Sequence, residues 1–168
     1  MDIEKLYQQK LIVSEQIADF LANDQNLILG MGVAMPPELI RGVSTALYSD
    51  QLKRLNLYYM HGSEVLSQTL LQPELADKVR ARSLFMSSHD RAAFKQLAIP
   101  ALVEFVPATF HQVGRLLTEQ VEPHCFMVTV SPMDKHGYFS LGTNADYGAS
   151  VIRKADKVIV EVNENMPR

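Results

Sequence analysis

The chain has 168 residues, of which 47% are hydrophobic and 21% charged, the composition of an ordinary globular domain with a core of its own. Its net charge of −3 argues against nucleic acid or an anionic membrane surface as a partner, and no apolar run approaches the ~20 residues of a membrane span. The single cysteine, Cys125, excludes an internal disulfide, and with a polar start that lacks a signal-peptide pattern it predicts a cytoplasmic protein.

The first half of the chain alternates helical patterns with short apolar runs. After a helical or loose leader, Ser14 is placed to N-cap a helix in which Ile17, Phe20 and Leu21 share one face. Pro37 is suited to the first turn of a later helix, where its missing N–H is no loss. We expect strands over 26–31, 55–60 and 82–86, and helical segments over 15–21, 64–71, 73–80, 89–97 and from Pro37 onward.

The second half continues the alternation. The apolar run Cys125 to Val130, bounded by Pro123 and Pro132, predicts a buried strand, and Asp134 and Gly137 then supply turn chemistry. The other expected strands are 101–105, 138–141 and 157–162, and the other expected helices are 109–119 and 146–154. Strands alternating with helices indicate a single α/β domain with an open, mostly parallel sheet and helices on both faces.

The loops that follow the expected strands are the candidate ligand site. In an open parallel sheet such loops gather along one edge, where hydroxyls and backbone N–H groups suit a carboxylate or a thioester carbonyl. These loops are Gly30–Pro37, His61–Ser63, Ser87–His89, Ser131–Gly137 and Gly142–Asn144. Taken singly, each glycine or serine is more simply explained by turn formation, and Ser63 and Ser88 are as well placed to cap helices.

The spacing of several other residues argues against a nucleotide, metal or catalytic site. Gly30 and Gly32 lack the third glycine of a dinucleotide fingerprint, and the five histidines and the lone cysteine show no metal-ligand spacing, so no metal site is expected. His89 and Asp90 are neighbours on a helix and do not face each other, so we expect Asp90 at a solvated helix start.

Two residues lie within expected strands. Cys125 should act there as a small hydrophobe. Glu161 is expected to face the solvated side of the last strand or to pair with Arg153, since a buried carboxylate needs partners.

One block also resembles a known family. The block is Ser131-Pro132-x-Asp134-x-His136-Gly137-Tyr138-x-Ser140-Leu141-Gly142, followed by Asp156 to Asn163 and by Pro167-Arg168. It resembles the acetyl-CoA hydrolase/transferase family, the class I CoA-transferases that include 4-hydroxybutyrate and acetate CoA-transferases. Residues 32–37 are similar to the family's first glycine-proline loop, and residues 57–63 to its second strand and loop.

The resemblance implies a protein of two similar α/β domains, of which residues 1–168 form the N-terminal one. It places the nucleophilic glutamate in the second domain, so no residue here is a catalytic candidate and this chain alone should be inactive. The glutamate attacks an acyl-CoA, passes through an anhydride and a glutamyl-CoA thioester, and gives CoA to an acceptor carboxylate. This domain would form one wall of the acyl and carboxylate pocket. Its substrate-binding candidates are Gly32, Ser63, Ser87, Ser88, Ser131 and Gly142.

The implied ligands are an acyl-CoA and a small carboxylate, with the CoA thioester a substrate and no cofactor bound by this chain. The C-terminal CoA-transferase domain is the implied partner, and we expect a homo-oligomer. Two alternatives remain open: an acetyl-CoA hydrolase domain, and a non-catalytic binding or assembly subunit that pairs with a separate catalytic chain. A sugar-phosphate isomerase would need a phosphate loop and a base, and neither stands out.

Overall fold

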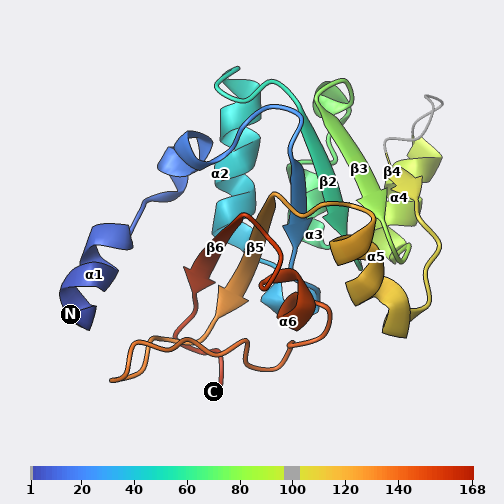
Figure 1. The fold of residues 1–168 in the computed structure, drawn as a ribbon. Helices are drawn as coiled ribbons and strands as arrows, with labels where there is room; N and C mark the ends of the chain where they lie inside the picture. The colour runs from blue at the N-terminus through green and yellow to red at the C-terminus, as the bar shows by residue number, and fades with distance from the viewer. Residues whose placement is uncertain (1, 97–102) are drawn as a thin grey trace.

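A parallel sheet forms the centre of the computed structural model, which describes residues 2–96 and 103–168. Within those residues the sheet has six strands in the order β4-β3-β2-β1-β5-β6, and every neighbouring pair is parallel. The strands are β1 (Asn26–Leu29), β2 (Leu55–Tyr59), β3 (Val79–Ser83), β4 (Val103–Phe105), β5 (Cys125–Val130) and β6 (Lys157–Val162). All strand arrows point to the same edge, as Figure 1 shows, so the expected parallel sheet is confirmed.

Helices cover both faces of the sheet, because alternate residues of the central strands point in opposite directions. Leu27 and Leu29 of β1 belong to the core cluster that includes the apolar side of α2. Ile28 belongs to the opposite cluster, together with Val113 and Val151. The first face carries α2 (Pro37–Tyr48), α3 (Glu64–Gln68) and the 3₁₀ helix η1 (Ser14–Phe20); the second carries α5 (Val113–Glu119) and α6 (Gly148–Val151). The remaining helical segments are α1 (Ile3–Lys10), α4 (Ser88–Gln96), and the 3₁₀ turns η2 (Gly32–Ala34), η3 (Pro73–Leu75) and η4 (Phe110–Gln112).

Several local predictions are confirmed. Every residue of β5 is buried, and Cys125 packs among apolar side chains as a small hydrophobe. Pro37 occupies the first turn of α2. The Ser63 hydroxyl accepts a hydrogen bond from the backbone N–H of Leu66, 3.4 Å away, and so caps α3. These features depend on residues close together in sequence, which explains why the sequence alone identifies them.

The third strand lies earlier than predicted. It spans Val79–Ser83, not 82–86, so residues 79 and 80, expected to be helical, are extended. Val79, Ala81 and Ser83 are buried while Arg80 is exposed, the alternation of a strand with one buried face. The residues after Ser83 are apolar, and this composition favours a strand in the sequence-based prediction. In the structure these residues form the loop after β3.

Other expected elements are shorter or different. The helix expected over 15–21 is a 3₁₀ helix, and it begins where the Gln16 side chain accepts a hydrogen bond from the Val13 N–H, 3.1 Å away, so Ser14 is not its cap. No strand forms over 138–141, and α6 replaces the longer helix expected over 146–154. Residues 97, 101 and 102 of two further predictions lie outside the described residues. No described helix is both long and apolar enough to cross a membrane.

Candidate functional site

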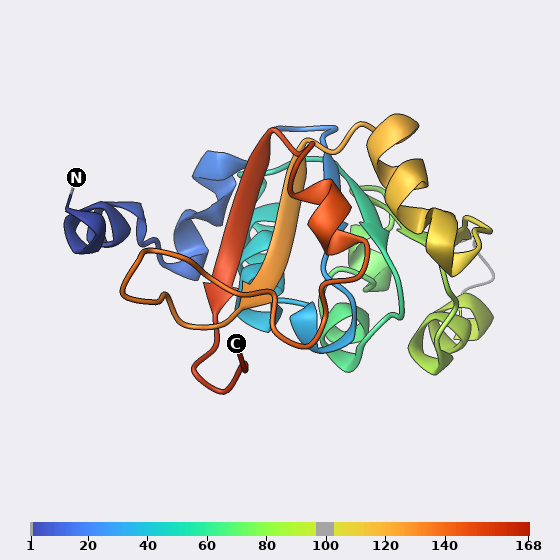
Figure 2. The ribbon, with the colours of Figure 1, turned by 60° about the horizontal axis from the view of Figure 1, so that its bottom comes forward.

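The loops expected to hold a ligand meet at the carboxyl edge of the sheet, which Figure 2 brings toward the viewer. A Cβ placed on Gly32, after β1, would lie 3.7 Å from the side-chain amide of Asn144. The Ser63 hydroxyl, after β2, lies 3.0 Å from the sulfur of Met35. Gly62 in the same loop contacts Asp90. Residues from three strand-end loops and from the first turn of α4 are therefore neighbours in space.

The loop after β1 is held close to the sheet and leaves one glycine at the surface. A Cβ on Gly30 would lie 2.4 Å from the carbonyl oxygen of Ala34, so only glycine fits there. Gly32 is exposed, has φ +58°, and has only Asn144 near its Cβ position. Its backbone is consequently open to a ligand from the carboxyl edge.

The position of Asp90 differs from the one that the sequence predicts. Its side chain is completely buried, whereas a solvated position was expected. Its Oδ1 accepts a hydrogen bond from the Tyr59 hydroxyl at 2.6 Å, and its Oδ2 accepts from the N–H groups of Gly62 at 3.1 Å and Ser87 at 2.7 Å. Burial, and then the Asp90 carboxylate, raise the pKa of Tyr59. Tyr59 and Gly62 come from another strand and its loop, so the sequence around Asp90 reveals only Ser87 among these partners.

The two candidate serines of α4 differ in position. The Ser87 hydroxyl accepts from the Asp90 N–H at 3.2 Å while the Asp90 carboxylate accepts from the Ser87 N–H, a reciprocal capping pair. Ser87 is thus the N-cap of α4, in place of the predicted Ser88. Ser88 is exposed at the start of the helix. Both serines come at the end of the loop after β3. Asp90 links this segment to the loop after β2, because its carboxylate accepts hydrogen bonds from both Ser87 and Gly62.

Ser131 and Gly142 shape the loop after β5. Ser131 is fully buried, its hydroxyl accepts from the Ser140 N–H at 3.0 Å, and its N–H donates to the Ser140 carbonyl at 2.9 Å. Gly142 has φ +60°, and a Cβ there would lie 2.4 Å from the Met166 sulfur. These contacts fold the loop back on itself. The Ser131 hydroxyl is occupied by the N–H group of Ser140 within the same loop.

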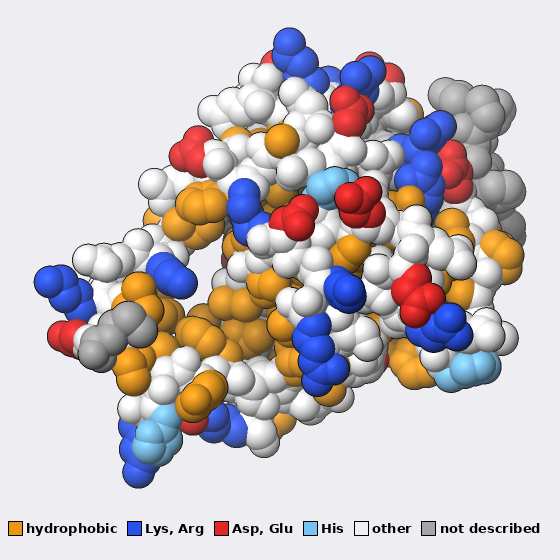
Figure 3. Space-filling view, viewed as in Figure 1, with side chains coloured by type: hydrophobic (Ala, Val, Ile, Leu, Met, Phe, Trp, Pro, Cys, Tyr) orange, Lys and Arg blue, Asp and Glu red, His pale blue; other side chains and the backbone are white. Residues whose placement is uncertain are grey.

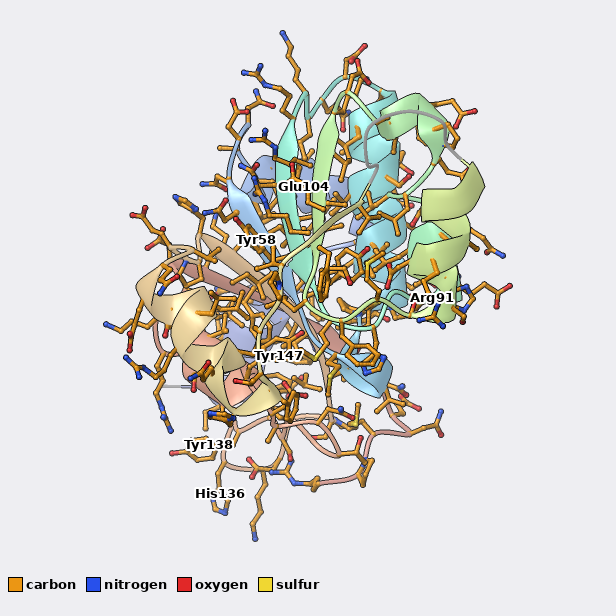
Figure 4. All side chains as sticks on the ribbon, turned by 90° about the vertical axis from the view of Figure 1, so that its right-hand side faces the viewer. Tyr58, Arg91, Glu104, His136, Tyr138 and Tyr147 are labelled. Carbon is orange, nitrogen blue, oxygen red and sulfur yellow. The ribbon has the colours of Figure 1, made fainter. Side chains whose placement is uncertain are left out.

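An arginine closes the same loop. Arg168 donates to the Asp134 carboxylate at 2.9 Å and to the carbonyl of Pro132 at 3.0 Å. Asp134 also accepts from the N–H groups of Tyr138 and His136, each at 2.9 Å. These hydrogen bonds, that of Tyr138 first, hold the pKa of Asp134 below its ordinary value. Figure 4 shows the side chains of His136 and Tyr138 extending from the end of this loop.

Glu161 binds a helix end and not Arg153. Its Oε2 accepts from the backbone N–H groups of Glu38 at 2.9 Å and Leu39 at 3.0 Å, in the first turn of α2. Burial raises the pKa of Glu161, and these two hydrogen bonds oppose that shift. The adjacent Thr129, paired with Glu161 in the β5–β6 ladder, has a buried hydroxyl without a hydrogen-bond partner.

A cavity of about 940 Å³ lies between α1 and the edge strand β6, and residues of the loop after β5 also line it. Figure 3 shows the hollow beside the main body of the molecule, with hydrophobic side chains around it. Its apolar lining includes Leu6, Tyr7, Phe20, Met133, Phe139 and Val160. Across residues 2–96 and 103–168, no cluster of three or more His, Cys, Asp and Glu side chains is placed to hold a metal ion.

Comparison with known proteins identifies the family. Residues 1–168 match the model of the acetyl-CoA hydrolase/transferase N-terminal domain. Succinyl-CoA:cyclohexane-1-carboxylate CoA transferase of Geobacter metallireducens is 28% identical over 165 residues, which are 98% of this chain and 36% of that protein. 4-hydroxybutyrate coenzyme A transferase of Clostridium kluyveri is 27% identical over 169 residues, covering 100% of this chain and 38% of that protein.

Solved structures agree. The crystal structure of RipA from Yersinia pestis is 37% identical with a TM-score of 0.94, and the match covers 100% of this chain and 40% of that one. A 4-hydroxybutyrate CoA-transferase from Porphyromonas gingivalis shares the fold, with a TM-score of 0.65 at 23% identity over 98% of this chain and 36% of that one. The chain thus spans well under half the length of these relatives. The chain belongs to the acetyl-CoA hydrolase/transferase family, whose N-terminal domain it matches from end to end.

Proposed function

We propose that residues 1–168 are the N-terminal domain of an acyl-CoA:carboxylate CoA-transferase of the acetate or 4-hydroxybutyrate type. The match of the whole chain to the family carries this proposal. The relatives support it, since those named above from Geobacter and Clostridium are both CoA transferases. Their greater length supports a second domain as the partner of this one.

In the proposed reaction this domain forms one wall of the acyl and carboxylate pocket. The exposed backbone of Gly32 allows a substrate to approach closely, and the Ser63 hydroxyl lies against the apolar side chain of Met35. A hydroxyl beside an apolar surface suits a short acyl chain that ends in a carbonyl or carboxylate. Ser87 and Ser88 lie at the neighbouring helix start, whereas Ser131 and Gly142 contribute by shaping the loop after β5.

The nucleophile belongs to the second domain in this proposal. The carboxylates of Asp90 and Glu161 are engaged with backbone N–H groups of their own chain. The glutamate of the partner domain would attack the thioester, while this wall binds the acyl group and excludes water. We further propose that the full protein is a cytoplasmic homo-oligomer, which sedimentation velocity of the full protein and fractionation of cells would test.

The test measures CoA transfer from an acyl-CoA to acetate with this chain alone, with a second chain carrying the C-terminal domain added, and with the two domains in one protein. We expect no turnover by the chain alone and turnover whenever both domains are present. Turnover by the chain alone would show that the nucleophile lies within these residues. No turnover in any of the three samples would reject CoA transfer and favour a binding or assembly subunit.

Hydrolysis is the second candidate, because the family description includes acetyl-CoA hydrolases. In hydrolysis water accepts the acyl group and free CoA is released. In transfer a carboxylate accepts the CoA. Release of free CoA from the two-domain protein without an added carboxylate would identify a hydrolase. Formation of acetyl-CoA that requires added acetate, without free CoA, would identify a transferase.

A Gly32→Asn variant tests the proposed wall directly. Asparagine tolerates the positive φ of this position better than most residues, and the space around the Cβ is open, so the fold should persist. The new side chain would occupy the surface assigned to the substrate. We expect a raised KM for the acyl-CoA with an unchanged Tm, and an unchanged KM would remove Gly32 from the site.

A further inference from the structure

The buried carboxylate of Asp90 has no part in the transfer chemistry proposed above. It lies in the first turn of α4 and its side chain is 0% exposed. A carboxylate without water persists in a protein only where donors satisfy its oxygens. Asp90 has the Tyr59 hydroxyl at 2.6 Å, the Ser87 N–H at 2.7 Å, the Gly62 N–H at 3.1 Å and the Ser83 hydroxyl at 3.4 Å.

These donors come from two strand ends and from the two loops that follow those strands. Tyr59 is the last residue of β2, Gly62 belongs to the loop after β2, and Ser83 is the last residue of β3. Ser87 ends the loop after β3 and caps α4. One side chain therefore ties two strand ends, two loops and a helix start at the carboxyl edge of the sheet.

The loop after β2 is shaped around this carboxylate. A Cβ on Gly62 would lie 2.2 Å from Oδ1 of Asp90, so the backbone contacts the carboxylate closely. His61, just before it, has φ +58°, a conformation that a residue with a Cβ adopts at a cost. Such a conformation persists where the surroundings enforce it, and the hydrogen bond from the Gly62 N–H to Asp90 holds the residue directly after His61.

The outer side of the two tied loops presents polar and aromatic groups. The His61 ring lies over the Phe85 ring, with 4.4 Å between their centroids, and the Phe85 residue is 51% exposed. Ser63 follows Gly62 and carries the hydroxyl assigned to the substrate wall. The contact between His61 and Phe85 joins the loop after β2 to the loop after β3 on the solvent side, while Asp90 joins them underneath.

We propose that Asp90 is a positioning residue, which holds the loops after β2 and β3 in one arrangement so that His61, Ser63 and Phe85 form a preformed surface for the acyl-CoA. The proposal rests on the function proposed above. Small displacements of groups that orient a substrate reduce turnover strongly, so a ligand surface built on loops needs such an anchor. Asp90 would act through the loops and would not contact the substrate.

Two substitutions distinguish the hydrogen bonds of Asp90 from its negative charge. In Asp90→Asn the single remaining oxygen can still accept from Gly62 and Ser87, since both of those bonds go to Oδ2. The new amide can donate to Tyr59, whose hydroxyl is also an acceptor. Asp90→Ala removes this acceptor from the Tyr59 hydroxyl and from the Gly62 and Ser87 N–H groups, whereas the Ser83 hydroxyl can still donate to the Phe85 carbonyl at 2.9 Å. Val79→Ala is the matched control for lost stability, because Val79 is buried at the amino end of β3, at the opposite edge.

The first readout is native-state hydrogen exchange of the Gly62 and Ser87 amides in this chain. We expect Asp90→Ala to accelerate their exchange by about tenfold or more beyond any change in the core amides, and Asp90→Asn to keep most of the protection. Equal protection in wild type and Asp90→Ala would overturn the proposal, as would Val79→Ala reproducing the same local effect.

The second readout is CoA transfer by the two-domain protein. Asp90→Ala should lower kcat/KM by about 10- to 100-fold, chiefly through a higher KM for the acyl-CoA, with Asp90→Asn rescued to within a few-fold of wild type. Wild-type turnover with an equally active Asp90→Ala variant would overturn this inference alone. A wild-type protein without transfer activity would overturn the proposed function and the substrate role of this surface together.

Discussion

Replacing Glu161 tests how the last strand supports the helix that follows the Gly32 loop. The Glu161→Ala variant removes the acceptor of the Glu38 and Leu39 N–H groups. The Glu38 N–H is near solvent and can bind water, whereas Leu39 is 6% exposed and its N–H would lose its partner. Loss of a helix-capping acceptor with one poorly hydrated donor is expected to lower the free energy of unfolding by about 1–2 kcal/mol.

The Glu161→Gln variant should behave differently. Both N–H groups donate to the same oxygen, so a glutamine keeps both bonds with its single carbonyl oxygen. Burial raises the pKa of Glu161 in the folded protein above that in the unfolded chain. The stability contributed by the protonated form is therefore complete below the unfolded pKa and is lost as the pH rises through the folded pKa. At neutral pH the glutamine variant should be at least as stable as wild type.

Urea denaturation followed by circular dichroism, at intervals from pH 4 to pH 8, measures these differences. Glutamine and wild type should agree at the acidic end, and the advantage of glutamine should develop as the pH rises. The alanine variant should be less stable than glutamine throughout. The reasoning would be refuted if glutamine were as unstable as alanine at pH 7, because the charge and not the acceptor would then hold α2.

Three further substitutions or treatments probe other parts of the fold. Gly30→Ala would place a Cβ 2.4 Å from the Ala34 carbonyl oxygen, so we expect a loss of about 1–3 kcal/mol in a denaturation experiment, and an unchanged midpoint would contradict the close approach. Burial raises the pKa of the Cys125 thiol to about 12, so a thiol reagent at pH 8 should react only after urea unfolds the chain; fast reaction of the native protein would contradict its burial. Arg168→Ala removes the clamp on Asp134, so a protease should cut the loop after β5 faster while the Tm stays unchanged; equal cleavage would show that the loop holds itself.

The elements that depend on local pattern could be read from the sequence. The run from Cys125 to Val130 is apolar throughout because β5 is a central strand covered on both faces, and its flanking prolines mark its ends. The Asp134 turn follows from a side chain that bonds backbone N–H groups two and four residues ahead. Alternation of such strands with helices is enough to indicate a parallel sheet, and hence the edge at which its loops gather.

The errors have a different physical origin. The sequence predicts solvated positions for Asp90 and Glu161 because their neighbours in sequence are polar or alternate. The partners of Glu161 lie more than 120 residues away, and Asp90 bonds Tyr59 and Gly62 at the end of another strand in addition to the nearby Ser87. Strand β3 was placed too late because its outward residues are charged while the loop after it is apolar. For both carboxylates the decisive interactions join distant parts of the chain.

The sequence by itself therefore determined the fold class, the position of the central strand, the turn after it and the resemblance to a family, because periodicity and turn chemistry act over a few residues. Only the tertiary structure decided which side chains serve as anchors beneath the candidate site. From the sequence, the hydroxyls of Ser131 and Ser87 could equally bind a ligand or the backbone. In the folded chain both hydroxyls accept hydrogen bonds from backbone N–H groups. A buried donor or acceptor must be satisfied by whatever the fold brings within reach, and that neighbourhood exists only after folding.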